Sequence, residues 1–123
     1  MKIALPLWEN RISPVLDEAR GFLIVEFRDG VEIERRTINL PPVSLPDKVK
    51  CLLNEGIDRI ICGAVSNALN SMLEANDVTV QPWCCGRVEE LLKAVQEDRL
   101  TDPRFNMPGC GRGRGRRRRR RGW

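Results

Sequence analysis

Short apolar runs separated by polar turns make up most of the chain, and their spacing alternates between the patterns of strands and of helices. Compact apolar runs bounded by turn residues are typical of buried strands. Such runs predict strands at residues 2–7, 57–62 and 78–80. Two further runs, 22–27 and 31–38, flank the dipeptide Asp29-Gly30. This dipeptide favours a two-residue turn, so the two runs predict a β-hairpin.

Three later segments place apolar residues three or four positions apart, as on one face of a helix. These apolar faces are Val49, Leu52 and Leu53, then Leu69, Met72 and Leu73, and last Val88, Leu91, Leu92 and Val95. They predict helices over residues 47–54, 66–76 and 86–96. Ser66 is the expected N-cap of the second helix, because its hydroxyl can accept a hydrogen bond from a free amide of the first turn.

The other segments predict two loops, 8–14 and 40–46, a single helical turn at 15–20, and an extended segment at 103–108. The resulting order is one strand, a hairpin, and then alternating helices and strands. This order predicts an α/β fold with a mixed five-stranded sheet whose first, fourth and fifth strands are parallel. We therefore expect a ribonuclease-H-like, three-layer α/β/α arrangement.

Composition narrows the class of protein. The chain has 123 residues, 41% hydrophobic and 31% charged, as expected of one globular domain. We expect a cytoplasmic protein with no membrane association, because no apolar run has the length of a membrane span and the N-terminus lacks a signal-peptide pattern. Five cysteines, an odd number, favour reduced thiols over a disulfide framework. The absence of histidine removes the commonest general base and metal ligand.

Two cysteine-glycine turns are the most informative chemical feature. Ile61-Cys62-Gly63-Ala64 and Trp83-Cys84-Cys85-Gly86 each end a predicted strand and open a predicted helix. Parallel strands bring their carboxyl ends to one crevice, and helix N-termini offer free N–H groups there. The turns are therefore expected to place three thiols and several amides around one soft, anionic ligand. The candidate residues of this crevice are Trp8, Asn10, Ser13, Cys62, Gly63, Ala64, Ser66, Cys84, Cys85, Gly86 and Arg87.

Several of these residues keep a structural alternative. Cys62 ends a buried strand, where a thiol often acts as a small hydrophobic group. Gly63 and Gly86 suit a tight turn as well as close approach to a ligand. Trp8 suits either a cover over the ligand or a core position. Arg87 at a helix start opposes the helix dipole, which favours an anionic partner, but a solvated arginine fits equally.

Four motifs in order resemble one known family: residues 2–14, 60–66, 85–90 and 107–110. Together they look like the dinitrogenase iron-molybdenum cofactor biosynthesis family, which includes NifX-type carriers and a small orange protein holding a molybdenum-copper sulfide cluster. The resemblance covers about residues 1–110. It implies a ribonuclease-H-like domain that carries or protects an iron-, molybdenum- or molybdenum-copper-containing sulfur cluster without turning over a substrate. Cys85 matches the family position beside Gly86, so it is the first candidate metal ligand, followed by Cys62 and Cys84.

The C-terminus predicts a separate module. We expect a globular domain at residues 1–108 and a disordered tail at 109–123, with Cys110 as a mobile thiol or a lid ligand. The polyanion-binding residues of this tail are Arg112, Arg114, Arg116, Arg117, Arg118, Arg119, Arg120 and Arg121. The rest of the chain holds 13 basic and 17 acidic residues. The tail therefore predicts salt-dependent binding to nucleic acid, or docking on an acidic protein or on the acidic face of its own domain. A solvated tail without a partner is the alternative.

Three functional hypotheses follow, and a non-enzymatic cluster carrier leads. The second is a nucleic-acid- or polyanion-associated module that acts through the tail. The third is an enzyme, which we do not expect: the first strand offers no aspartate for a two-metal nuclease, and the chain has no Cys-x-x-Cys pair for redox exchange.

Overall fold

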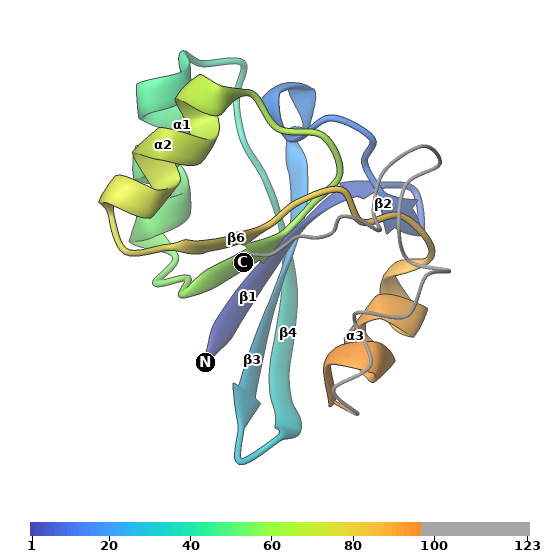
Figure 1. Cartoon of the computed structure of the whole chain (residues 1–123). Coiled ribbons are helices and arrows are strands. Elements are labelled where there is room, and N and C mark those ends of the chain that lie inside the picture. Colours follow the sequence, from blue (N-terminus) through green and yellow to red (C-terminus); the bar gives the residue numbers. More distant parts are fainter. Residues whose placement is uncertain (97–123) are drawn as a thin grey trace.

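The structure, a computed structural model, describes residues 1–96 as a mixed β-sheet with helices on both faces (Figure 1). In chain order the elements are β1 (Lys2–Trp8), β2 (Arg11–Ile12), the 3-10 turn η1 (Leu16–Glu18), β3 (Gly21–Arg28), β4 (Val31–Asn39), α1 (Leu45–Asn54), β5 (Arg59–Ile61), α2 (Asn67–Ala75), β6 (Thr79–Gln81) and α3 (Val88–Gln96). The predicted 15–20 turn, the hairpin, the parallel strands and the three helices are all present.

The sheet has the order β4-β3-β1-β5-β6. β1 and β5 are parallel, as are β5 and β6, whereas β3 is antiparallel to both β1 and β4. The predicted mixed sheet with three parallel strands is thus confirmed. The predicted count of five strands is wrong by one, because β2 pairs with the end of β1 through Leu7↔Ile12 and Trp8↔Arg11. Residues 8–14 therefore contain a second hairpin where a loop was expected.

Alternation along the strands builds an apolar cluster on each face of the sheet. Phe22 and Ile60 belong to the cluster beneath α1 and α2. Ile3 and Val25 belong to the other cluster, beneath α3. Each buried side chain of this size contributes roughly 1.5–3 kcal/mol to folding. The sheet thus lies between one layer of two helices and a second layer formed by α3 (Figure 1).

Helix starts differ by about two residues from the sequence prediction. α1 begins at Leu45 because Ser44 Oγ accepts a hydrogen bond from Asp47 N at 3.4 Å, and Pro46 is tolerated in the first turn. α3 begins at Val88 because Gly86 has a φ of 120°, which is not helical. The predicted N-cap of α2 is confirmed: Ser66 Oγ accepts from Leu69 N at 3.1 Å.

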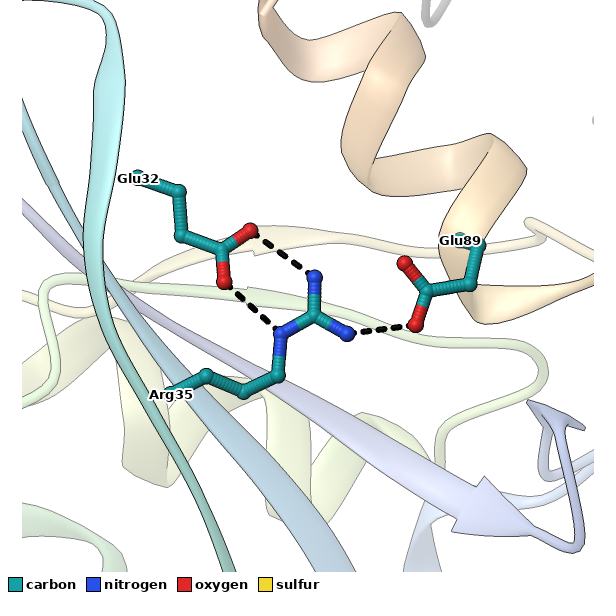
Figure 2. Close-up of polar contacts among 3 residues, drawn as sticks. All are labelled: Glu32, Arg35 and Glu89. Atoms are coloured by element: carbon teal, nitrogen blue, oxygen red, sulfur yellow. Dashed lines mark hydrogen bonds and ion pairs between the residues drawn. The ribbon is translucent and has the colours of Figure 1, made fainter.

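The β3–β4 hairpin holds α3 through an ion triad. Asp29 and Gly30 both have positive φ, 56° and 78°, as a tight two-residue hairpin turn requires. A register shift beside Phe27 then turns Glu32 and Arg35 towards the same face, although their spacing would normally separate them. Arg35 makes two 2.8 Å hydrogen bonds to Glu32 and a third to Glu89 of α3 (Figure 2).

Within residues 1–96 no helix has both the length and the apolar content needed to span a membrane. Several predictions fall outside the described residues. These are the extended segment 103–108, the domain boundary after 108, the tail, Cys110 and the eight tail arginines.

Candidate functional site

Three turns meet at the carboxyl ends of β1, β5 and β6, as predicted. Backbone hydrogen bonds join them: Ala64 N donates to Pro14 O at 2.8 Å, and Leu16 N donates to Ala64 O at 2.8 Å. The third turn joins them through Trp83 N, which donates to Gly63 O at 2.9 Å. Their amides therefore serve largely to hold the turns together.

Gly63 is required by the protein's own backbone. A Cβ atom at this position would lie 2.6 Å from Pro14 O and 3.0 Å from Ser13 O. Real Cβ atoms do not approach a carbonyl so closely, and neither carbonyl is free to move away. Of the two interpretations left open by the sequence, close packing therefore explains Gly63, and the partly buried Ser13 contributes its carbonyl to that packing.

The N-terminus of α2 already faces an anion supplied by the chain. Asp17 accepts hydrogen bonds from Ser66 N at 2.9 Å and from Ser66 Oγ at 2.5 Å. A carboxylate is stabilised there by the helix dipole, as a bound anionic ligand would be. Sequence reasoning missed this role of Asp17, because the two residues are 49 positions apart and no local pattern links them.

Lys48 of α1 fixes the turn that carries Asp17. Its side chain is buried, with 4% exposed, and Nζ donates to Leu16 O, Asp17 O and Ala19 O at 3.0, 2.7 and 2.7 Å. Burial lowers the pKa of Lys48, and the nearby acidic groups Asp17 and Glu18 oppose this shift. The three carbonyl contacts satisfy the buried ammonium group. No local pattern predicts this burial, since lysine usually lies on the exposed face of a helix.

The cysteines of the two turns do not converge. Cys62 lies in the apolar cluster beneath α1 and α2, whereas Cys84 lies in the cluster beneath α3, on the other face of the sheet. Burial raises the pKa of the Cys62 thiol well above its ordinary value and that of Cys84 to about 12. Both thiols are thus protonated at neutral pH, whereas metal ligation needs thiolate.

Cys85 is the thiol best placed at the surface of this end of the sheet. It is partly buried and directly precedes Gly86 and Arg87. Among residues 1–96 no group of three cysteine, aspartate or glutamate side chains is arranged to hold a metal ion. The expected ring of three thiols around one ligand is therefore absent from the part of the chain that the structure describes.

A hollow of about 300 Å³ lies between the β1–β2 hairpin and the start of α3. Its lining residues are Trp8, Glu9, Asn10, Arg11 and Arg87. Two backbone hydrogen bonds set its width: Ile12 N donates to Gly86 O at 3.0 Å, and Val88 N donates to Asn10 O at 2.9 Å. Three predicted site residues, Trp8, Asn10 and Arg87, are thereby brought together.

The hollow carries positive charge that the described chain leaves unpaired. Arg11 and Arg87 are both exposed, and neither guanidinium group forms an ion pair or hydrogen bond with any other residue of 1–96. Glu9 is the one acidic side chain among the lining residues. Sequence reasoning missed Arg11, although its place opposite Trp8 follows once Glu9 and Asn10 are recognised as a two-residue turn.

Two turns at this end of the sheet each contain a residue with a strained backbone. Glu9 has a φ of 60° and Trp83 a φ of 64°, in the left-handed region that side-chain-bearing residues other than Asn and Asp seldom occupy. Each such residue costs about 1–3 kcal/mol, and strained residues are concentrated at functional sites. The tryptophans are also exposed, with 61% of Trp8 and 44% of Trp83 accessible. Trp8 therefore covers the hollow and takes no part in the core.

Solved structures share this fold at low sequence identity. PH0822, a protein known from its crystal structure, is 15% identical, with a TM-score of 0.76 over 80% of this chain and 90% of its own. A protein from Methanocaldococcus jannaschii, provisionally named a dinitrogenase, is 19% identical, with a TM-score of 0.68 over 80% and 90%. A Thermotoga protein, provisionally named NifB and assigned to the DUF35 family, is 20% identical, with a TM-score of 0.64 over 93% and 98%.

No protein-family model matches the chain, and no curated protein matches it in sequence. TM-scores of 0.64–0.76 establish a common fold with these structures, at identities of 15–20%. A function has to be argued from the site itself.

Proposed function

We propose that this chain is a non-enzymatic carrier or assembly protein for an anionic metal-sulfur cluster or an iron-molybdenum cofactor precursor. The cargo is held in the hollow between the β1–β2 hairpin and α3. The observation that carries the proposal is the pair of arginines, Arg11 and Arg87, that face this hollow without a partner in residues 1–96.

The chemistry of the hollow suits such a cargo. Clusters and thiometallates present sulfide on their surface and carry net negative charge, which two guanidinium groups neutralise while donating hydrogen bonds. The hollow adjoins the N-terminus of α3, whose dipole adds to the positive potential. Trp8 supplies an apolar cover, and Cys85 is the nearest candidate for a direct sulfur contact. Charge and hydrogen bonds supply most of the binding energy, and thiolate ligation is secondary.

The names of the structural neighbours support the same class of cargo. Two of the similar structures carry names from nitrogenase systems, a dinitrogenase and NifB. The strand order β4-β3-β1-β5-β6 with helices on both faces is also the basis on which we assign the fold to the ribonuclease-H-like class. Particular metals and delivery routes do not transfer at such identities.

A carrier accounts for the site better than an enzyme does. Nucleophilic catalysis needs an activated group with a base beside it, and the two buried thiols of the turns are held protonated. The hollow offers one carboxylate, Glu9, and no histidine exists in the chain. Glu9 alone provides no acid-base pair.

The test is reconstitution of anaerobically purified protein with iron and sulfide, or with tetrathiomolybdate and copper. Stoichiometric metal and sulfide, with charge-transfer bands in the visible spectrum, is the expected result. Cys85→Ala is compared with Cys51→Ala, a partly buried thiol on α1 remote from the hollow. Loading weakened by Cys85→Ala alone makes Cys85 a direct contact. Failure of the wild-type protein to take up metal under every condition contradicts the proposed function.

The tail supports a second candidate function, binding to nucleic acid or another polyanion. Eight arginines within residues 112–121 would release condensed counterions on binding, so affinity should fall steeply with salt. Deletion of residues 109–123 tests this function. Binding to an oligonucleotide that survives the deletion would rule out the tail as its source.

A further inference from the structure

We propose that the surface at the carboxyl ends of β1, β5 and β6, which includes the hollow, is a docking surface for an acidic protein, the one that delivers or receives the cargo. The docking face consists of Trp8, Val15 and Trp83 together with Arg11 and Arg87. The inference rests on the proposed function for the partner's role, whereas the surface itself is argued from exposure, strain and charge.

Large apolar side chains are exposed on all three turns at this end of the sheet. Trp8 is 61% accessible, Val15 37% and Trp83 44%. Val15 pairs with Ala64, and Trp83 N donates to the neighbouring Gly63 O, so the turns bearing Val15 and Trp83 are directly joined. Tryptophan and arginine are the residues most enriched among those that dominate protein–protein binding energy. The composition of the docking face is therefore that of an interface centre.

The docking face is also held rigid before any partner arrives. Trp83 occupies a backbone conformation with φ of 64°, which a bulky residue adopts only where the surrounding structure imposes it. The β1–β2 hairpin is tied to the start of α3 by the hydrogen bonds from Ile12 N to Gly86 O and from Val88 N to Asn10 O. A surface ordered in advance loses little conformational entropy on binding. The strain at Trp83 thus serves to present its ring to a partner.

Charge complementarity identifies the partner as acidic. Arg11 and Arg87 have no ion-pair partner in the described chain, so carboxylates on another protein can reach both while the hollow holds no cargo. A nucleic-acid strand needs a continuous positive track, and Glu9 interrupts the positive lining of this hollow.

The experiment uses the full-length protein with its tryptophans labelled with nitrogen-15. The probe is a synthetic amphipathic peptide of leucine and glutamate, and the matched probe has lysine in place of glutamate. The indole N–H signals of Trp8, Trp83 and Trp123 are followed separately, so that binding to the arginine-rich end, reported by Trp123, is resolved from binding to the docking face. We expect saturable shifts at Trp8 and Trp83 with the glutamate peptide. The double variant Arg11→Gln/Arg87→Gln should weaken this binding about tenfold, and Val43→Ala should not change it.

Four outcomes overturn the inference. These are shifts confined to Trp123, and equal shifts with the lysine peptide. The third is a shift of Trp8 and Trp83 with oligouridylate, used as a nucleic-acid probe, but not with the glutamate peptide. The fourth is a shift of these signals with protein concentration when no peptide is present. Metal and sulfide loading is measured on the same preparations. Peptide binding without loading would retain the docking face and reject the cargo proposal, and loading without peptide binding would do the reverse.

Discussion

Two strand-to-helix turns at the same end of the sheet are similar in sequence but have different surroundings in the fold. The turn at residues 62–66 is filled by the chain itself, because Pro14 O packs on Gly63 and Asp17 binds Ser66. The turn at 84–87 opens beside the hollow, where Arg11 and Arg87 have no partner in residues 1–96. A cysteine-glycine turn is therefore a place where a site can form, and distant residues decide whether a ligand or the protein occupies it.

Gly63→Ala should have the largest effect on the turn that the chain itself fills. The new Cβ would meet Pro14 O at 2.6 Å, a backbone atom that cannot rotate away. We expect a loss of about 3 kcal/mol in the free energy of unfolding, measured by urea denaturation. Gly21→Ala is the control, since its Cβ meets a side-chain atom, Asn39 Oδ1, at 3.3 Å, and the cost should stay below about 1 kcal/mol. Equal losses in the two variants would refute tight packing at Gly63.

The buried thiols predict a pH dependence of stability. Burial raises the pKa of Cys62 and of Cys84 in the folded protein above the ordinary value of 9.0. Above pH 9 the unfolded chain loses these protons while the folded chain keeps them, so stability is complete below pH 9 and is lost as the pH rises towards 12. From pH 9 to 10 we expect a loss of about 1 kcal/mol per thiol.

Urea denaturation at several pH values, under reducing conditions, measures this loss, and Cys84→Ala should flatten the dependence by about half. A profile that Cys84→Ala leaves unchanged would show that Cys84 ionises in the folded state, as a metal ligand would.

Asp17→Ala removes the carboxylate that binds Ser66 in the turn at residues 62–66. The substitution deletes the two hydrogen bonds to Ser66, and we expect a loss of about 1–2 kcal/mol in the free energy of unfolding. Because the N-terminus of α2 then lacks an anion, added sulfate should raise the melting temperature of this variant more than that of wild type. Glu18→Ala, an exposed neighbour, is the matched control. A sulfate response identical in all three proteins would mean that Asp17 does not fill an anion position.

Apolar spacing carried most of the fold prediction. The β3–β4 hairpin, the parallel order of β1, β5 and β6, and the N-cap at Ser66 all follow from local patterns. Convergence of the three turns follows from the geometry of parallel strands. Strand β2 was missed because two residues are too few to show alternation, and helix starts shifted where Ser44 and Gly86 control the backbone.

The candidate site was harder to predict because pairs distant in sequence form it. Asp17 meets Ser66, and Lys48 meets the carbonyl groups of η1, only through the tertiary fold. The separation of Cys62 from Cys84 depends on the faces that β5 and the end of β6 present to the two helix layers. Trp8, Asn10 and Arg87 could be grouped from the sequence because each lies on a turn that parallel strands bring together, and all three line the hollow.

Anion binding in the hollow is tested by titrating the protein with tetrathiomolybdate and following its visible absorption and the quenching of tryptophan fluorescence. Wild type is compared with Arg11→Gln/Arg87→Gln and with Arg28→Gln, an exposed arginine on β3 outside the hollow. We expect the dissociation constant of the double variant to rise about tenfold or more, with the stability of all three proteins equal within about 0.5 kcal/mol. Binding to the double variant as tight as to wild type would contradict the claim that the hollow holds the anion.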